Sequence, residues 1–108
     1  MIPKSNRLNA KRHFKSVYQK GKTIRSKLFI CRYLRKPTDQ PPRISVVISR
    51  KKVPGAVERN LIRRRYKAAF KNCMQGLSGI DLIFIPNGSQ GQEFKEIARG
   101  VEECLKNL

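Results

Sequence analysis

The chain has 108 residues, of which 25 are lysine or arginine and 7 are aspartate or glutamate, so its formal net charge is +18. This length allows one domain with a modest core and excludes two independent domains. The charge predicts a polyanionic partner, most often a nucleic acid, with an anionic membrane surface as the competing explanation. The apolar runs are far shorter than the roughly 20 residues of a membrane span, and the basic N-terminal segment does not have the form of a secretory signal. We therefore expect a cytoplasmic protein with no membrane partner.

The first predicted element is a short helix over Ala10 to Lys20, with Phe14, Val17 and Tyr18 on one side. We interpret Gly21 as the left-handed glycine that often ends a helix. Two aromatic residues at i and i+4 make one surface. Such a surface belongs either to the core or to a site that stacks unpaired bases, and the sequence leaves both readings open.

Strands are predicted next. Residues 22–36 are rich in β-branched, aromatic and aliphatic types, which indicates one or two strands. Residues 37–42, with three prolines, form a loop. Arg43 to Ser49, RISVVIS, is a strand whose continuous apolar centre is typical of an interior position. Residues 50–52, RKK, are either a solubilising loop or part of a positive patch with the helix that follows.

A long helix is predicted over Ala56 to Gln75, which has no internal Gly or Pro, follows Pro54-Gly55 and ends before Gly76. Its apolar stripe has the spacing of a buried helix face and consists of Ile62, Tyr66, Ala69 and Cys73, with Phe70 alongside. An arc of about 140° beside it carries cations that repel one another at i,i+4 spacing. This basic face consists of Arg59, Asn60, Arg63, Arg64, Lys67 and Lys71. We expect a negative charge outside the fold to neutralise it.

The chain closes with a strand and a helix. Ile80 to Ile85, IDLIFI, is an apolar strand that Pro86-Asn87-Gly88 terminates. Ser89 to Gln92 has the S-x-x-Q form of a capping box, and apolar residues then repeat at helical spacing from Phe94 to Leu105. The order of elements predicts one α+β sandwich with helices packed on a sheet.

Groups for catalysis are sparse. The chain has 1 histidine and few, scattered acidic residues, so we predict no catalytic residue and no metal site. Cys31, Cys73 and Cys104 lie far apart in the sequence and lack any C-x-x-C spacing. This indicates reduced, packed thiols rather than a disulfide framework or a zinc site. What remains is a binder whose affinity comes from phosphate contacts.

The segment SRKKVPGAVERNLIRR, Ser49 to Arg64, resembles the signature of the protein subunit of bacterial ribonuclease P. The resemblance continues in order through Asn6-Arg7-Leu8, Phe14-x-x-Val17-Tyr18 with Gly21, Arg43 to Val46 and Asp81 to Ile85. It implies a single-domain α-β-β-β-α-β-α two-layer sandwich of the ribosomal protein S5 domain 2-like type. It also implies a left-handed βαβ crossover, against the general right-handed preference.

The resemblance implies a function as well. The family's protein joins a catalytic RNA that removes the 5′ leader of precursor tRNA, and the RNA carries the chemistry. Mg²⁺ would be bound mainly by that RNA. The partners implied are thus the catalytic RNA and precursor tRNA, with no DNA. The alternative is a ribosomal-type RNA-binding protein of similar α+β build that has no processing role.

Three groups of site residues follow from the resemblance together with the patterns above. The basic face of the long helix would contact the catalytic RNA. A strand-end basic patch would consist of Ser49, Arg50, Lys51 and Lys52. A cleft for the precursor leader would be lined by Phe14, Val17, Tyr18, Ile30, Arg32 and Ile44. The chain departs from the family pattern at Leu61, where an arginine is usual and the leucine is expected to pack, at Arg32, often an aromatic, and at Asn87, commonly an arginine.

Overall fold

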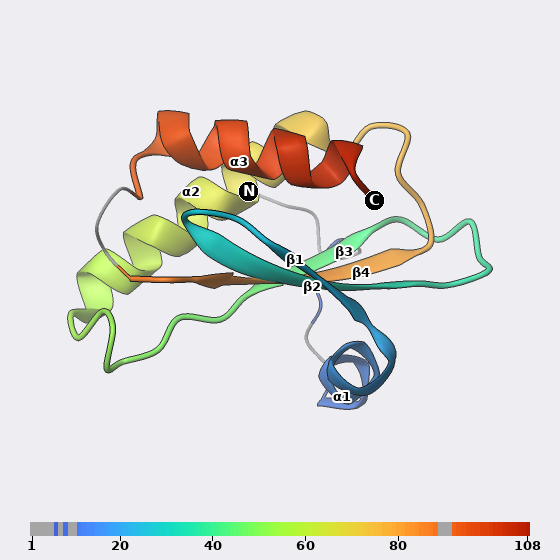
Figure 1. The fold of residues 1–108 in the computed structure, drawn as a ribbon, viewed down its shortest axis with the longest axis horizontal. Coiled ribbons are helices and arrows are strands. Elements are labelled where there is room, and N and C mark those ends of the chain that lie inside the picture. The colour runs from blue at the N-terminus through green and yellow to red at the C-terminus, as the bar shows by residue number, and fades with distance from the viewer. Residues whose placement is uncertain (1–5, 7, 9–10, 89–91) are drawn as a thin grey trace.

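The computed structural model describes residues 6, 8, 11–88 and 92–108 (Figure 1). Ala10 of the predicted first helix, Arg7 of the opening motif and Ser89 to Gly91 of the predicted capping box lie outside these residues. The predicted order of elements is confirmed. In chain order they are α1 (Lys11–Lys20), β1 (Lys22–Arg25), β2 (Phe29–Arg35), β3 (Arg43–Val46), α2 (Ala56–Cys73), β4 (Ile80–Pro86) and α3 (Phe94–Lys106).

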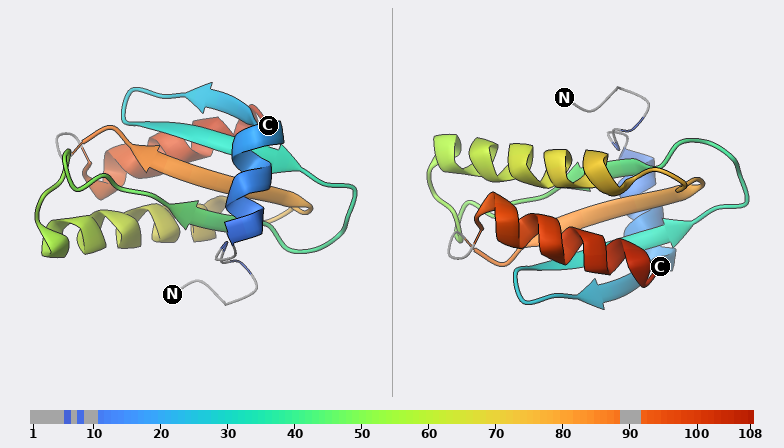
Figure 2. Two further views of the ribbon diagram at one scale, coloured as in Figure 1. Left: turned by 90° about the horizontal axis from the view of Figure 1, so that it is seen from below. Right: turned by 90° about the horizontal axis from the view of Figure 1, so that it is seen from above.

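The four strands form one mixed sheet in the order β1-β2-β4-β3. β2 pairs antiparallel with β1 and β4, whereas β3 and β4 are parallel and are connected through α2. In the right-hand view of Figure 2 the helices α2 and α3 lie in front of the sheet, β3 and β4 both run leftward, and β3 lies above β4. The crossover is therefore left-handed, as the resemblance implied.

The larger core lies between the sheet and the two helices α2 and α3, which cover one of its faces (Figure 1). The predicted apolar stripe of α2 is confirmed for Ile62, Tyr66, Ala69 and Phe70, which are buried, whereas Cys73 at its end is half-buried. Three aromatic rings meet at its centre: Phe29 packs edge-on against Tyr66 at 5.7 Å and against Phe84 at 5.2 Å between ring centroids. This packing fixes the orientation of α2 and turns its other side outward.

α1 lies across the opposite face of the sheet (Figures 1 and 2). Val17 is fully buried there with Leu8 and Ile83, and Phe14, Leu34 and Ile85 pack around them. The sandwich of sheet and two helices thus has a partial third layer on its second face. Only α1 covers this face among the described helices, so part of the sheet beside it stays accessible.

Two local predictions are wrong. Gly21 does not have a positive φ; among the described glycines only Gly76 (φ 82°) and Gly79 (φ 61°) do. Glycine is required at position 21 because a Cβ there would overlap the carbonyl oxygens of Val17 and Tyr33 where the end of α1 meets the sheet. The predicted capping box is also wrong, because α3 begins at Phe94 with Glu93 as its N-cap.

Gln92 has a different role from the predicted cap. It is buried, and its Oε1 accepts a hydrogen bond of 2.6 Å from the Tyr66 hydroxyl. Its Nε2 donates to the Leu28 carbonyl at 2.8 Å, and its own carbonyl accepts from Arg65 at 2.6 Å. Gln92 therefore joins α2, the β1–β2 turn and the segment that leads into α3.

Candidate nucleic-acid interface

The basic face of α2 divides into an inner and an outer part. Arg59 is half-buried, and its Nη1 donates to the carbonyls of Val53 at 2.8 Å and Pro54 at 2.7 Å. Its guanidinium thus holds the loop that enters α2. The outer residues Arg64 and Lys71 are exposed, and within the described part of the chain neither forms an ion pair.

Between these parts lie the remaining members of the basic face. Arg63 is half-buried and donates to the exposed Asn60 side chain at 3.1 Å, and Lys67 is also half-buried. The only acidic residue in the first turn of α2 is Glu58. Because the like charges along this side of the helix repel one another, the face favours a bound polyanion.

The strand-end basic patch lies in the loop between β3 and α2. Ser49, Arg50, Lys51 and Lys52 are all exposed, but the backbone that carries them is fixed. The amide of Lys51 donates to Ser49 Oγ at 3.1 Å, and the amide of the fully buried Val53 donates to the Ser49 carbonyl at 3.0 Å. Together with the Arg59 contacts, this anchoring joins the patch to the first turns of α2 as one basic surface.

The second predicted surface lies beside α1. Tyr18 is 42% exposed, Phe14 and Ile30 are half-buried, and Val17 is fully buried and belongs to the small core. Ile44 is wrongly placed in the predicted cleft. It is 2% exposed and packs in the larger core on the other face, because successive side chains of a strand point to opposite faces of the sheet.

Two residues that the sequence reasoning missed belong to the same face as Ile30. Ile85 is the cross-strand partner of Ile30, and Val47, 38% exposed, follows β3 with its amide bonded to the Phe84 carbonyl at 2.9 Å. Strand alternation would have found both, since Ile85 is two residues from Ile83 and Val47 two from Ser45. We call Phe14, Tyr18, Ile30, Val47 and Ile85 the α1-side surface.

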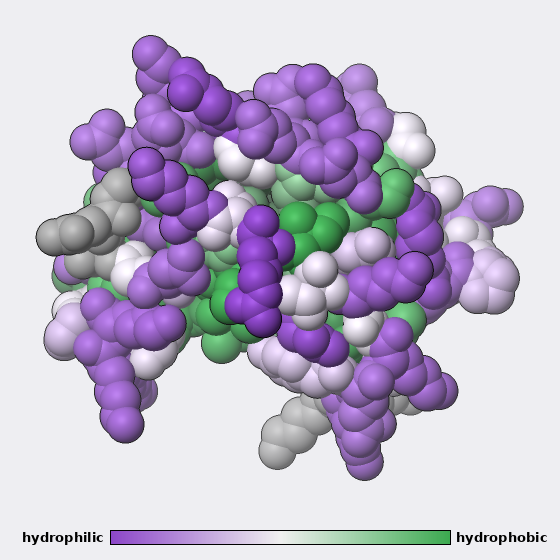
Figure 3. Space-filling model, in the orientation of Figure 1, coloured by the Kyte–Doolittle hydropathy of each residue, from purple (hydrophilic) through white to green (hydrophobic). Residues whose placement is uncertain are grey.

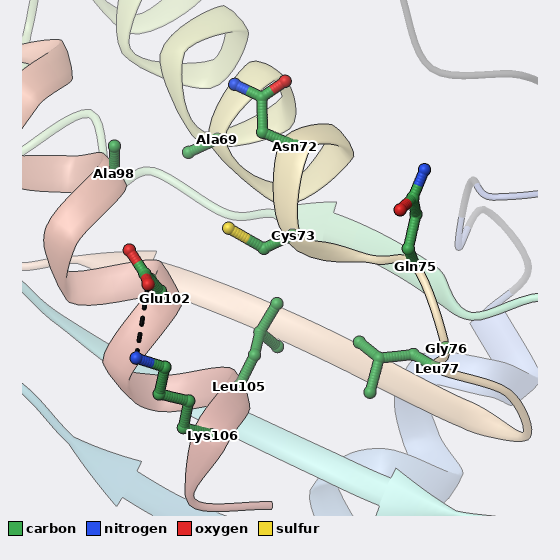
Figure 4. Close-up of a pocket in the computed structure, with 10 residues that line it drawn as sticks. All are labelled: Ala69, Asn72, Cys73, Gln75, Gly76, Leu77, Ala98, Glu102, Leu105 and Lys106. Carbon is green, nitrogen blue, oxygen red and sulfur yellow. Dashed lines mark ion pairs between the residues drawn. The ribbon is translucent and has the colours of Figure 1, made fainter.

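A groove of about 580 Å³ lies between the end of α2 and α3 (Figure 4). Cys73 points into it, and the Glu102–Lys106 ion pair of 3.3 Å lies on its α3 side. Burial raises the pKa of the Cys73 thiol, which keeps it protonated and weakly nucleophilic. Cys31 and Cys104 are buried, and all three cysteines are free, as predicted. The groove lies on the α3 side of α2 and does not touch the basic face.

Hydrophilic side chains cover most of the face seen in Figure 3, with apolar surface visible only between them. None of the helices in the described part of the chain is long and apolar enough to cross a membrane. The groups that stand out on the described surface are therefore the cations and the partly exposed aromatic residues, which are the groups that bind RNA backbone and unpaired bases.

Comparison with known proteins shows which family the chain belongs to. The family model described as Ribonuclease P matches residues 2–108. The chain belongs to the ribonuclease P protein family. A ribonuclease P protein component of Carboxydothermus hydrogenoformans is 35% identical over 92% of this chain and 87% of its own length. One of Clostridium botulinum (strain 657 / Type Ba4) is 32% identical over 95% of this chain and 94% of its own.

Solved structures carry the same fold. The ribonuclease P protein of Staphylococcus aureus superimposes with a TM-score of 0.82 at 24% identity, covering 96% of this chain and 95% of that one. The protein of Thermotoga maritima gives a TM-score of 0.81 at 23% identity, covering 94% and 96%. The predicted α+β fold is thus confirmed as that of the ribonuclease P protein family.

Two of the departures that the resemblance indicated can be placed in the structure. Leu61 was expected to pack, but it is 38% exposed on the outer side of α2. Asn87 ties the end of β4 to the β1–β2 turn: its side chain donates to the Lys27 carbonyl at 3.0 Å and its amide to the Leu28 carbonyl at 2.8 Å. The first change puts an apolar side chain on the surface of the candidate interface, and the second gives position 87 a role in the fold.

Proposed function

We propose that this chain is the protein component of ribonuclease P. It binds the catalytic RNA and the 5′ leader of precursor tRNA, and it assists the endonucleolytic removal of the leader in the cytoplasm. The observation that carries the proposal is family membership along nearly the whole chain, joined to an anchored basic surface on which Arg64 and Lys71 are exposed and form no ion pair with the described residues. The protein is the accessory subunit of a ribonucleoprotein endoribonuclease whose chemistry belongs to the RNA.

The basic face of α2 and the strand-end basic patch together bind the catalytic RNA. Arginine forks make bidentate contacts with phosphate, whereas lysine supplies point charges. Each phosphate that is neutralised releases condensed counterions, so affinity falls steeply with salt. Since Arg59 and the Ser49 turn fix the backbone beneath these side chains, the cations are presented by a rigid support.

The α1-side surface receives the precursor leader. Unpaired bases stack on exposed aromatic rings, and the ring of Tyr18 is accessible at the edge of apolar residues from the sheet. Phe14 and Val17 position this helix through the small core. The leader is single-stranded and mature tRNA lacks it, so this surface distinguishes the substrate from the product.

Magnesium ions are expected to be held mainly by the RNA partner. In the described part of the chain, no group of three or more His, Cys, Asp or Glu side chains could hold a metal ion. The buried carboxylate of Asp81 is already bound by Arg43 and Lys36. The described residues therefore do not fit a magnesium site.

Adding the protein to its cognate catalytic RNA at low magnesium should restore cleavage of precursor tRNA at the mature 5′ end. The physical reason is that the protein's cations replace part of the charge neutralisation that magnesium supplies at higher concentration. The measurement is single-turnover cleavage of labelled precursor with and without protein. If the protein binds the RNA but gives no stimulation, the ribosomal-type alternative is the better account.

Tyr18→Ala should weaken binding of the reconstituted complex to precursor tRNA by about 1–3 kcal/mol, the contribution of one stacked base, and leave binding of mature tRNA nearly unchanged. The measurement is the dissociation constant for each RNA. Phe94→Ala is a matched control, because Phe94 is 40% exposed on α3, away from the α1-side surface. An equal loss on both RNAs would assign Tyr18 a purely structural role.

A further inference from the structure

The side chain of Arg32 lies between the sheet and the end of α1. Its Nη1 donates to Thr23 Oγ1 at 2.7 Å, and its Nη2 donates to the Tyr18 carbonyl at 2.6 Å. Nη2 also contacts the carbonyls of Val17 and Gly21, each at 3.4 Å. One guanidinium thus connects β1 and β2 to the last turn of α1.

These acceptors explain why a cation is stable at this position. The last carbonyls of a helix have no partner within the helix and carry its negative dipole end, so a cation there is favourable. Glycine at position 21 lets the end of α1 approach the sheet, because any Cβ would overlap the carbonyl oxygens of Val17 and Tyr33. Arg32 therefore fixes where α1 ends above the sheet.

The same contacts direct the charge of Arg32 inward. Both terminal nitrogens of its guanidinium are engaged by groups of the fold, and Nε is buried without a hydrogen-bond partner among the described residues. A phosphate ligand would need these donors to face solvent. The departure at position 32 from the aromatic that the family often carries is therefore not explained by an added phosphate contact.

Arg32 also holds the exposed ring of Tyr18. Its guanidinium carbon lies over this ring, 5.7 Å from the centroid, which is within the range of a cation–π contact. Tyr18 as a whole remains 42% exposed, so surface is left for another planar group. The arrangement fixes Tyr18 through both its backbone carbonyl and its ring.

We propose that Arg32 is a positioning residue that holds the Tyr18 ring as a stacking platform for one unpaired nucleotide of the precursor leader. The proposal rests on the proposed function and adds a specificity-determining contact to it. An aromatic at position 32 would supply a ring from the sheet, whereas here the sheet supplies a cation that fixes a ring from α1. Preorganisation of one side chain improves affinity because less side-chain freedom is lost on binding.

The test is a double-mutant cycle on the complex of this protein with its catalytic RNA, measured with precursor tRNA carrying a leader and with mature tRNA. Arg32→Met should weaken precursor binding by about two- to tenfold, the range expected for ordering one side chain, and leave mature tRNA nearly unaffected. In the Tyr18→Ala background the same change should add no further loss, because the two residues act as one unit. Additive losses would overturn the proposal.

A second variant separates positioning from charge. Arg32→Lys keeps the cation but cannot reach both Thr23 and the end of α1, so we expect it to behave like Arg32→Met. The slope of log affinity against log salt should be unchanged in both variants. Full rescue by lysine, or a slope lower in magnitude by about 0.7–0.9, would instead make Arg32 a phosphate ligand. Circular dichroism of both variants checks that they fold.

Measurements on the wild-type protein distinguish a failure of the proposed leader contact from a failure of the role of Arg32 alone. If the wild-type complex binds precursor and mature tRNA equally, the leader contact in the proposed function fails and the role of Arg32 fails with it. If the wild type prefers the precursor and Arg32 and Tyr18 show no coupling, only the role of Arg32 fails. Preference for the precursor together with coupling supports both.

Discussion

Asp81→Asn should lower the free energy of unfolding by about 3 kcal/mol, the lower end of the cost of breaking a buried ion pair. The Asp81 side chain is 3% exposed, and its two oxygens accept hydrogen bonds from Arg43 Nε at 2.8 Å and Nη2 at 2.9 Å. Lys36 forms a second ion pair with the same carboxylate. The variant removes the Asp81 charge from beside Arg43 and Lys36, whose side chains are 19% and 29% exposed. Urea unfolding at pH 7 measures the difference.

The loss should depend on pH. Burial by itself raises the pKa of Asp81, but the hydrogen bonds and charges of Arg43 and Lys36 outweigh it and hold this pKa below its ordinary value of 3.8. The stabilisation from the carboxylate is therefore fully present above the unfolded-state pKa and is lost as the pH falls through the lower folded-state pKa. The difference between wild type and Asp81→Asn should be constant near neutrality and shrink below about pH 4.

A matched control is Asp39→Asn, since Asp39 is exposed in the loop between β2 and β3. It should change the unfolding free energy by less than about 0.5 kcal/mol, as most surface substitutions do. A comparable loss from both variants would mean that general charge repulsion in this basic chain, and not the buried ion pair, determines the effect of Asp81.

The local part of the fold could be predicted because helix and strand periodicities are local. The stripe of Ile62, Tyr66 and Ala69 predicted the buried side of α2, and the apolar run of β4 predicted a strand. The interior position predicted for Arg43 to Ser49 is wrong, because β3 lies at the edge of the sheet and its apolar side chains are buried by packing in the larger core. The errors arose where contacts between residues far apart in the sequence determine the local structure. Gly21 is needed for the approach of α1 to Tyr33, and Gln92 bonds to Tyr66, 26 residues away, in place of a cap. No local pattern contains these partners.

The candidate site also has features that local patterns predict and features that depend on distant contacts. A single sign of charge at helical spacing predicted the basic face of α2, although only the structure shows that Arg59 points into the loop it anchors. The α1-side surface depends on which face each strand residue takes. Ile44 was assigned to the wrong face, while Ile85 was missed although its alternation with Ile83 was available. The inward contacts of Arg32 could not be predicted, because they require the position of α1 above the sheet.

Replacing Arg63, Arg64 and Lys71 together with glutamine should lower the affinity for the catalytic RNA about a hundredfold at 0.15 M salt and reduce the magnitude of the salt slope by about 2 to 3. Each residue is expected to neutralise one phosphate, and the two quantities are linked because counterion release produces both. The fold should be unharmed, or slightly stabilised, since like charges at i,i+4 spacing are removed. Filter binding across a salt series measures affinity and slope together.

The control removes the same charge from another helix. Lys95, Arg99 and Lys106 are exposed on α3, where Arg99 and Lys106 form surface ion pairs with Glu96 and Glu102. Such pairs contribute little to stability, so their replacement by glutamine should be tolerated. If the affinity for RNA depends only on the net charge of the protein, both triple variants will change the affinity and the salt slope equally. If α2 is the interface, only the first will change the slope by the full amount, because the phosphates must lie against the side chains that neutralise them.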